Sequence, residues 1–224
     1  PADENINEYA CSYLKSALKH LIRFQLVGSK VISFSMCVPR PVFDEQSILW
    51  DLQYFKYYVL KLFNIPFDEQ NLEDDFNRMA RFLSSVKNNY FMYRDFQSRN
   101  ILIHNGELFF VDYQGGRKGA AQYDVASLLY DAKIPMLHKN REELLEYYIN
   151  YFCEASGEDK ILFRGYYSGF SMIRIMQALG AFAFLSMRKG KPEFAQYIPA
   201  GVAALREAAP QATVVAYSDN AAVI

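Results

Sequence analysis

Residues 91–112 read FMYRDFQSRNILIHNGELFFVD, and this stretch decides the fold. Two short apolar runs lie on either side of its Asn105-Gly106 pair. Asn-Gly is the dipeptide most typical of a two-residue β-hairpin turn, because both turn positions need a positive φ. The sequence therefore predicts a β-hairpin with Asn100 and Asp112 at neighbouring ends of its two strands.

Oxygen-bearing side chains meet at that end of the hairpin. Asp95 lies five residues before Asn100, in a polar loop that is unsuited to a core. Carboxylate and amide oxygens suit Mg²⁺, which keeps several waters and binds few protein oxygens together with phosphate oxygens. A further carboxylate that is free to accept a hydroxyl proton completes a site for phosphoryl transfer. Asp95, Asn100 and Asp112 are therefore predicted to form one such site.

The spacing of these three residues resembles a known pattern. An Asp, four residues, an Asn and a later Asp at the end of a hairpin resembles the catalytic loop and metal-binding Asp of the protein-kinase-like fold. The segments DYQGGRKG (112–119) and QYDVASLLYD (122–131) resemble the small-molecule branch of that fold, which includes aminoglycoside phosphotransferases, choline kinases and sugar anomeric kinases. They are most similar to the sugar kinases that act on N-acetylmuramate or N-acetylglucosamine. The resemblance covers residues 91 to 133.

The resemblance implies a role for individual residues. Asp95 would be the catalytic base, with Arg94 beside it in the catalytic loop. Asn100 and Asp112 would hold Mg²⁺ against the phosphates of ATP. Asp124 would be a buried structural carboxylate that fixes the catalytic loop.

The sequence departs from the family pattern at two positions, and further residues are predicted to approach the acceptor. Tyr93 stands where the family usually has His, at a position that is mostly scaffolding, and Gln114 stands where many relatives have Gly. Asp131 either faces the acceptor or is a surface charge at a helix end. Residues 115–119 form either a solvated turn or a flexible basic loop that brings positive charge near the substrate. The residues predicted to approach the acceptor are Arg99, Gln114, Arg117 and Asp131.

The composition limits the class of protein. The 224 residues are 51% hydrophobic with a net charge of −1, so a packed domain or one large lobe is expected and a general nucleic-acid binder is not. The three cysteines fit no metal spacing and are interpreted as reduced thiols. No basic leader with an apolar run and no uninterrupted apolar span of about 18 residues occurs, so a cytoplasmic protein is predicted.

Apolar periodicity predicts a largely helical chain. Asp44 and Asp68 are predicted N-caps, Gly28 and Gly157 are predicted helix ends, and Asn140 with Glu143 is predicted to form a capping box. Residues 31–38 alternate like a strand that Pro39 and Pro41 cut short. The predicted helices are 5–24, 45–63, 69–86, 123–130, 141–155, 159–187 and 193–208.

These expectations define an α+β, mostly α fold, the carboxy-terminal lobe of a protein-kinase-like enzyme. Residues 1–208 would form the lobe that carries the catalytic loop and binds the acceptor, and 209–224 a tail or linker. The chain lacks a glycine-rich loop and a strand lysine, which a nucleotide-covering lobe needs. That lobe is expected upstream in the same polypeptide, with exposed apolar patches here where it would dock.

The function predicted is an ATP- and Mg²⁺-dependent transfer of a phosphoryl group to a hydroxyl of a small molecule, an amino sugar or an aminoglycoside-like compound. The chain alone would be a weak catalyst or inactive. Its expected partners are the small-molecule acceptor and the missing lobe, and neither nucleic acid nor a membrane. One alternative is a non-catalytic kinase-like module that binds a nucleotide or a partner. Another is a helical interaction domain whose acidic loop is coincidental.

Overall fold

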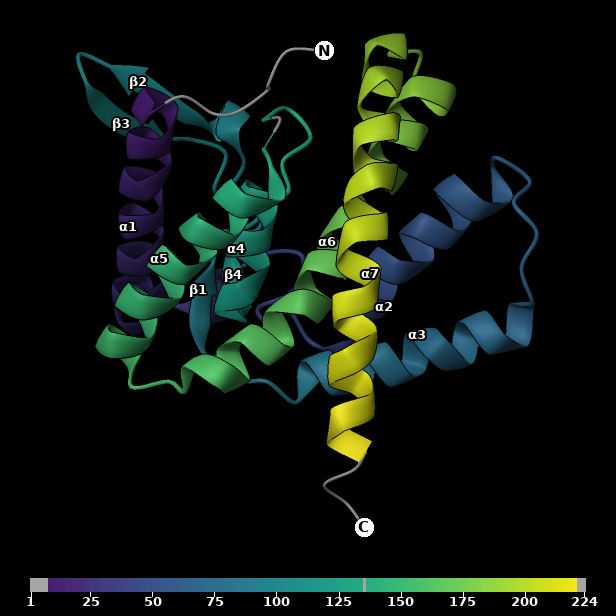
Figure 1. The fold of residues 1–224 in the computed structure, drawn as a ribbon, viewed down its shortest axis with the longest axis horizontal. Helices are drawn as coiled ribbons and strands as arrows, with labels where there is room; N and C mark the ends of the chain where they lie inside the picture. Colours follow the sequence, from purple (N-terminus) through teal and green to yellow (C-terminus); the bar gives the residue numbers. More distant parts are fainter. Residues whose placement is uncertain (1–7, 135, 221–224) are drawn as a thin grey trace. The chain divides into compact units, whose positions relative to one another are not determined.

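A computed structural model describes residues 8–134 and 136–220, with side chains described as far as residue 209. The described chain is mostly helical with two small sheets (Figure 1). It divides into two compact units. The first unit is Pro1–Phe43 with Lys87–Tyr167, and the second unit is Asp44–Val86 with Ser168–Ile224.

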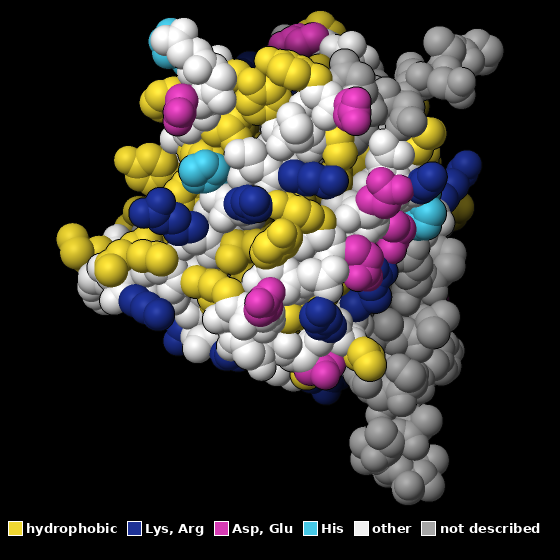
Figure 2. Space-filling model, turned by 60° about the vertical axis from the view of Figure 1, so that its left-hand side comes forward, with side chains coloured by type: hydrophobic (Ala, Val, Ile, Leu, Met, Phe, Trp, Pro, Cys, Tyr) yellow, Lys and Arg dark blue, Asp and Glu magenta, His cyan; other side chains and the backbone are white. Residues whose placement is uncertain are grey.

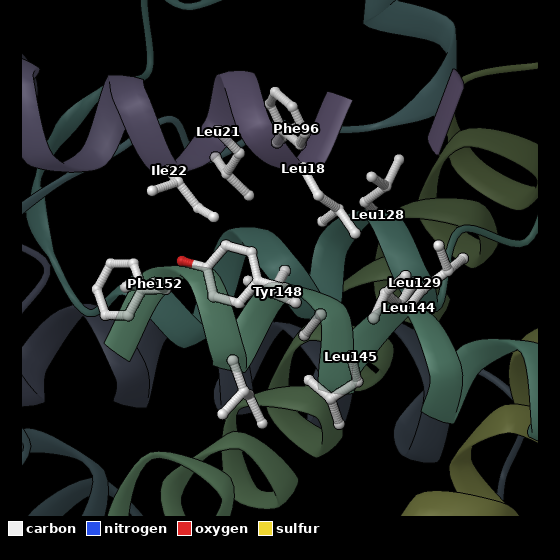
Figure 3. Close-up of a cluster of buried hydrophobic side chains, with 14 of the residues drawn as sticks. Leu18, Leu21, Ile22, Phe96, Leu128, Leu129, Leu144, Leu145, Tyr148 and Phe152 are labelled. Carbon is white, nitrogen blue, oxygen red and sulfur yellow. The ribbon is translucent and has the colours of Figure 1, made fainter. Parts of the chain in front are cut away.

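The helices of the first unit enclose one hydrophobic core. They are α1 (Glu8–Val31), α4 (Ala121–Leu129), α5 (His138–Ser156) and the beginning of α6 (Lys160–Arg188). Their apolar side chains point toward one another, and Phe96 of the loop at 93–100, the predicted catalytic loop, joins them (Figure 3). This loop, called the catalytic loop below for its predicted role, is therefore packed directly on the core of the unit. Fully buried members of the core include Leu18 and Leu21 of α1, Leu128 of α4, and Leu144, Tyr148 and Phe152 of α5.

Helix α1 continues past the end that Gly28 was predicted to mark, as far as Val31. A Cβ atom at Gly28 would lie 3.0 Å from Cβ of Phe91. Glycine is needed there because α1 passes close to the strand that carries Phe91, and not because the helix ends. The predicted end at Gly28 is wrong for this reason.

A buried two-stranded sheet lies beside the catalytic loop. β1 (Tyr90–Met92) pairs antiparallel with β4 (Arg117–Gly119), with Tyr90 opposite Gly119 and Met92 opposite Arg117. Residues 117–119, expected to be part of a flexible loop, are therefore a strand. Cβ atoms at Gly116 and Gly119 would each lie 2.6 Å from side-chain atoms of Phe91 and Met92, so the glycines permit this close packing.

Residues 31–38 do not form the short strand that their alternation suggested. They contain a 3₁₀ helix, η1 (Phe34–Met36), after the end of α1. The chain reaches the buried sheet only later, where Val42 forms a parallel bridge with Lys118.

The predicted β-hairpin is confirmed. β2 (Ile101–His104) pairs antiparallel with β3 (Glu107–Phe110), and the turn residues Asn105 and Gly106 have φ values of 52° and 80°. The inner face packs on α1, where the ring of Phe110 lies 5.0 Å from that of Phe24. On the outer face Leu102 and Phe109 stay 49% and 50% exposed.

The regular elements of the second unit are all helices over its described residues. The predicted N-caps are confirmed, since Asp44 accepts a bond from Ser47 N at 3.0 Å and Asp68 accepts one from Asn71 N at 2.8 Å. Buried Lys56 forms ion pairs with Glu69 and Glu73 and so ties the first helical segment to the next. Its elements are α2 (Glu45–Phe55), the π-helix η2 (Lys56–Lys61), α3 (Glu69–Ser84), the later part of α6, the 3₁₀ helix η4 (Pro192–Tyr197) and α7 (Ile198–Asn220).

Some helix boundaries later in the chain differ from the prediction, and others agree. α5 begins at His138, so Asn140 lies inside the helix and the predicted capping box does not start it. Gly157 ends α5 with a φ of 73°, as predicted. α7 continues to Asn220, past residue 208. The division of the chain at residue 209 stays a prediction.

Helix α6 is the one described helix that is long and apolar enough to cross a membrane by length and composition. Half of its most apolar window is buried within the structure. Figure 2 shows the side of the molecule where α1 lies, with Lys and Arg side chains spread among hydrophobic ones. The cytoplasmic location stays a prediction.

Candidate functional site

Asp124 of α4 holds the backbone at the start of the catalytic loop. Its carboxylate is fully buried and accepts hydrogen bonds from Tyr93 N at 2.7 Å and Arg94 N at 2.9 Å. Arg94 has a φ of 79°, an unfavourable conformation for a residue with a side chain. The two bonds stabilise this conformation just before Asp95, which is the task that the predicted structural role of Asp124 requires.

Burial changes the acidity of this carboxyl group. It raises the pKa of Asp124 to about 7, although the two backbone N–H groups act in the opposite direction. Desolvation disfavours the charged form and hydrogen bonds to that form favour it. The loop is therefore held by a group whose charge depends on pH.

Tyr93 joins the catalytic loop to the end of the hairpin. Its hydroxyl donates a hydrogen bond to the carbonyl oxygen of Val111 at 2.7 Å. Burial raises the pKa of Tyr93 to about 12, so the hydroxyl keeps its proton at neutral pH. Because Val111 precedes Asp112, the Tyr93 hydroxyl connects the loop to the segment that carries Asp112.

The side chain of Arg94 lies between two aromatic rings. Its guanidinium carbon is 4.8 Å from the ring centre of Phe43 and 4.8 Å from that of Tyr123. A cation over an aromatic face at this distance is attracted to it. The contacts give Arg94 an anchoring role for the loop, and its catalytic role stays a prediction.

Asp95, the predicted base, is partly exposed and lies beside the loop that follows Asp112. Its Oδ1 accepts a bond of 3.3 Å from Gln97 Nε2. A Cβ atom at Gly115 would lie 4.0 Å from its Oδ2. Gly115 leaves room on that side of the carboxylate, and the segment after Asp112 reaches Asp95.

Asn100 and Asp112, the predicted metal ligands, are brought together by the strand ends. The backbone N–H of Val111 donates a hydrogen bond to the carbonyl oxygen of Asn100 at 3.0 Å. Asp112 is the next residue after Val111, so it lies close to Asn100. Asn100 is 6% exposed, and its Nδ2 donates to Asp95 O at 2.9 Å. The amide oxygen is then the atom left to face a cation.

The donor set fits a magnesium ion that also binds phosphate. Asp112 is exposed, and its Oδ1 accepts a bond from Gln114 Nε2 at 3.0 Å. No group of three His, Cys, Asp or Glu side chains suited to a metal occurs within the described residues. One carboxylate and one amide match Mg²⁺, which takes its other ligands from water and phosphate.

The predicted acceptor-site residues occupy different surroundings. Arg99 is exposed in the 3₁₀ helix η3 (Ser98–Asn100). Arg117 is buried in β4 and donates from Nε to Gly115 O at 3.0 Å. Gln114 holds Asp112, as described above. Asp131 accepts bonds from Ser98 N and Oγ and from Lys133 N. Contact of these four with an acceptor stays a prediction.

Three residues of the site were missed in the sequence. Gln97 donates to Asp95, Ser98 donates to Asp131, and Phe43 receives the guanidinium of Arg94. A serine at the first position of a short helical turn is a local signal for an anchored turn. Phe43 gave no such signal, because it lies about 50 residues away from the loop in sequence.

A surface groove elsewhere on the first unit contains none of the predicted site residues. It has a volume of about 740 Å³ and runs along α5 beside α1. Its lining mixes charges of both signs, including Lys15, Lys139, Glu142 and Glu146. The groove is therefore separate from the candidate site.

Comparison with solved structures identifies the fold. Choline kinase from Cryptosporidium parvum Iowa II superposes with a TM-score of 0.61 at 13% sequence identity, over 93% of this chain and 69% of that chain. The chain has a choline kinase-like fold. An ethanolamine kinase from Plasmodium vivax superposes on the same fold with a TM-score of 0.59 at 15% identity, over 88% of this chain and 59% of that chain.

The choline kinase-like fold confirms the kinase-like, mostly helical lobe expected from residues 91–133. By sequence, no protein-family model and no curated protein matches the chain. The chain spans 69% and 59% of the lengths of the two kinases. At these identities the likeness describes the fold, and activity is treated below as a proposal.

Proposed function

We propose that this chain is the acceptor- and metal-binding part of an ATP- and Mg²⁺-dependent phosphotransferase that acts on a hydroxyl of a small molecule. The observation that carries the proposal is the joining of Asp95, Asn100 and Asp112 at one end of the hairpin. Asn100 donates to the Asp95 carbonyl, and Val111 donates to the Asn100 carbonyl. The choline kinase-like fold supports the same assignment.

Each residue has one task in the proposed reaction. Asp95 orients the acceptor hydroxyl and accepts its proton as the oxygen bonds to the γ-phosphorus and the bond to ADP breaks. Asn100 and Asp112 hold Mg²⁺, which when bound neutralises charge on the phosphates. Tyr93 and Asp124 keep the loop in place, so catalysis depends mainly on positioning and electrostatics.

The outer face of the hairpin supports a nucleotide on this side of the site. Leu102 and Phe109 are paired across the hairpin and are 49% and 50% exposed, and Val111 and Tyr113, which flank Asp112 in the chain, are 39% and 65% exposed. An apolar surface beside phosphate-binding groups suits the flat face of a nucleotide base. A nucleotide-covering lobe upstream in the same polypeptide would close over it, so this chain alone should be a weak catalyst.

The proposed acceptor is an amino sugar or an aminoglycoside-like compound. The two solved structures are kinases of choline and of ethanolamine, which are small amino alcohols. Quaternary ammonium groups are typically held by aromatic faces. In this chain Phe43 and Tyr123 hold the guanidinium of Arg94, so these two rings are not open to a choline headgroup. The resemblance of residues 112–131 to sugar kinases supports the choice of an amino sugar.

The test is ATP consumption by the polypeptide with its upstream segment, measured against amino sugars, aminoglycosides, choline and ethanolamine. The proposal expects Mg²⁺-dependent turnover with an amino sugar or aminoglycoside and its loss in Asp95→Asn. Turnover only with choline or ethanolamine would overturn the acceptor assignment. Nucleotide binding without turnover on any acceptor would favour the alternative, a non-catalytic kinase-like module.

A further inference from the structure

Helix α4 is followed by a second carboxylate that grips the catalytic loop. Asp131 lies two residues after α4 ends at Leu129. Its Oδ2 accepts bonds from Ser98 N at 2.8 Å and from Ser98 Oγ at 2.7 Å, and its Oδ1 accepts one from Lys133 N at 3.0 Å. Both oxygens of Asp131 are therefore committed to holding protein groups.

Asp124 and Asp131 hold the loop before and after Asp95 in the chain. Asp124 binds the backbone of Tyr93 and Arg94 on one side, and Asp131 binds Ser98 on the other. A charged acceptor makes a stronger hydrogen bond than a neutral one, and Ser98 gives Asp131 two of them. The two ends of the loop are thus fixed to α4 and to the segment that directly follows it.

Ser98 connects Asp131 to Asn100, the predicted metal ligand. It begins the 3₁₀ helix that ends at Asn100, and its carbonyl accepts a bond from the backbone N–H of Ile101. The orientation of Asn100 is completed by its bonds to Asp95 O and from Val111 N. A shift of Ser98 would therefore turn the amide of Asn100 away from its set direction.

We propose that Asp131 is a positioning residue, which sets the metal-binding orientation of Asn100 through Ser98. This inference rests on the proposed function, and it replaces direct contact of Asp131 with the acceptor. Residues that orient a metal ligand typically affect metal affinity by about 10- to 100-fold when they are changed. Asp131 acts on the metal ligand indirectly, through Ser98, so the loss of metal affinity should be near the lower end of that range.

The test is the Mn²⁺ affinity of the polypeptide with its upstream segment, measured by electron paramagnetic resonance in the presence of a non-hydrolysable ATP analogue. Asp131→Ala should weaken Mn²⁺ binding about 10-fold. Ser98→Ala removes only the hydroxyl bond and should weaken it about 5-fold, as expected for one hydrogen bond. Ser98→Thr should recover most of that loss, because it restores the hydroxyl.

Glu154→Ala is the matched control, since it removes an exposed carboxylate from α5 and should leave Mn²⁺ affinity unchanged. Thermal unfolding of every variant shows that affinities are compared on folded protein, and Ser98→Ala keeps the test intact if Asp131→Ala does not fold. Asp112→Ala separates the two levels of the proposal. If Asp112→Ala abolishes Mn²⁺ binding while Asp131→Ala and Ser98→Ala bind like the original chain, the positioning role is wrong. If Mn²⁺ fails to bind, or binds equally well to Asp112→Ala, the proposed function itself is wrong and the positioning role is wrong with it.

Discussion

The two small sheets of the first unit differ in how they meet solvent. The sheet of β1 and β4 is buried, with glycines where the side chains of Phe91 and Met92 press against the chain. The β2–β3 hairpin is packed on one face only and exposes Leu102 and Phe109 on the other. The buried sheet fixes the start of the catalytic loop, whereas the open one presents predicted ligands at its end. Changes in the buried sheet should therefore reduce stability, and changes at the loop and the open sheet should reduce function.

The largest effect on function is expected from Asp95→Asn. Loss of the proton acceptor should lower turnover by about 10²- to 10⁴-fold, the range for a general base. The amide keeps the shape of the side chain, so nucleotide affinity and the melting temperature should stay unchanged. Steady-state kinetics with ATP titration measures both. Unchanged turnover in this variant would refute the assignment of Asp95.

Asp112→Ala should remove the Mg²⁺-dependent part of nucleotide binding. Asp112 is a proposed direct ligand, so its loss should exceed the 10- to 100-fold typical of a residue that only orients a ligand. The side chain is exposed, but Asp112 has a φ of 71°, which Asp tolerates better than Ala, so the free energy of unfolding should fall by about 1 kcal/mol. Calorimetric titration of nucleotide with and without Mg²⁺ checks this. Equal Mg²⁺ dependence in both proteins would contradict the ligand role.

Gly116→Ala tests the buried sheet. The new Cβ would lie 2.6 Å from the ring of Phe91 and 2.9 Å from Tyr113 O, so the free energy of unfolding should fall by about 1–3 kcal/mol. Gly115→Ala is the matched control, because its Cβ would meet nothing nearer than 3.6 Å. Urea unfolding of both variants gives the comparison. Equal loss in the two would show that the packing of β4 does not set stability.

The free energy of unfolding should depend on pH through the ionisation of Asp124. The pKa of this carboxyl is raised from 3.8 to about 7 in the folded chain, so the folded state binds a proton that the unfolded state has released. Its contribution is fully present below pH 4 and is lost as the pH rises toward 7. Unfolding at pH 4.5 and 7.5 should show a larger difference in the original chain than in Asp124→Asn. The same difference in both proteins would argue against a buried, protonated Asp124.

The smallest effect on stability is expected from Phe109→Ala. Half of this ring is exposed on the outer face of the hairpin, so the free energy of unfolding should change by about 0.5 kcal/mol or less. The neighbouring Phe110→Ala should be more destabilising, by about 2 kcal/mol, because that partly buried ring packs on α1. Nucleotide affinity should fall in Phe109→Ala. A large stability loss there would mean that the outer face is not open.

Structural features that depend on residues close together in the sequence were predictable. The Asn105-Gly106 turn and the caps at Asp44 and Asp68 depend on local backbone chemistry, and all three are confirmed. Gly28 and Gly116 were misinterpreted, because their role depends on a ring of Phe91 that approaches from elsewhere in the chain.

The candidate site follows the same rule. The ends of the hairpin place Asn100 next to Asp112, so that part was accessible from spacing alone. The partnership of Ser98 with Asp131 joins residues 33 positions apart and was not. The anchoring of Arg94 between Phe43 and Tyr123 likewise needs the folded chain. Local sequence spacing therefore predicts the metal ligands, whereas the residues that fix their positions are known only from the folded structure.

The most direct test of the central claim is to locate the metal in solution. Mn²⁺ added to the isotopically labelled chain, with a non-hydrolysable ATP analogue, broadens the amide signals of nearby residues. We expect the strongest broadening at Asp95, Asn100 and Asp112, and much weaker broadening at Glu154, an exposed carboxylate of α5 in the same unit. Broadening centred on other residues, with the signals of these three unchanged, would contradict a metal site at the end of the hairpin.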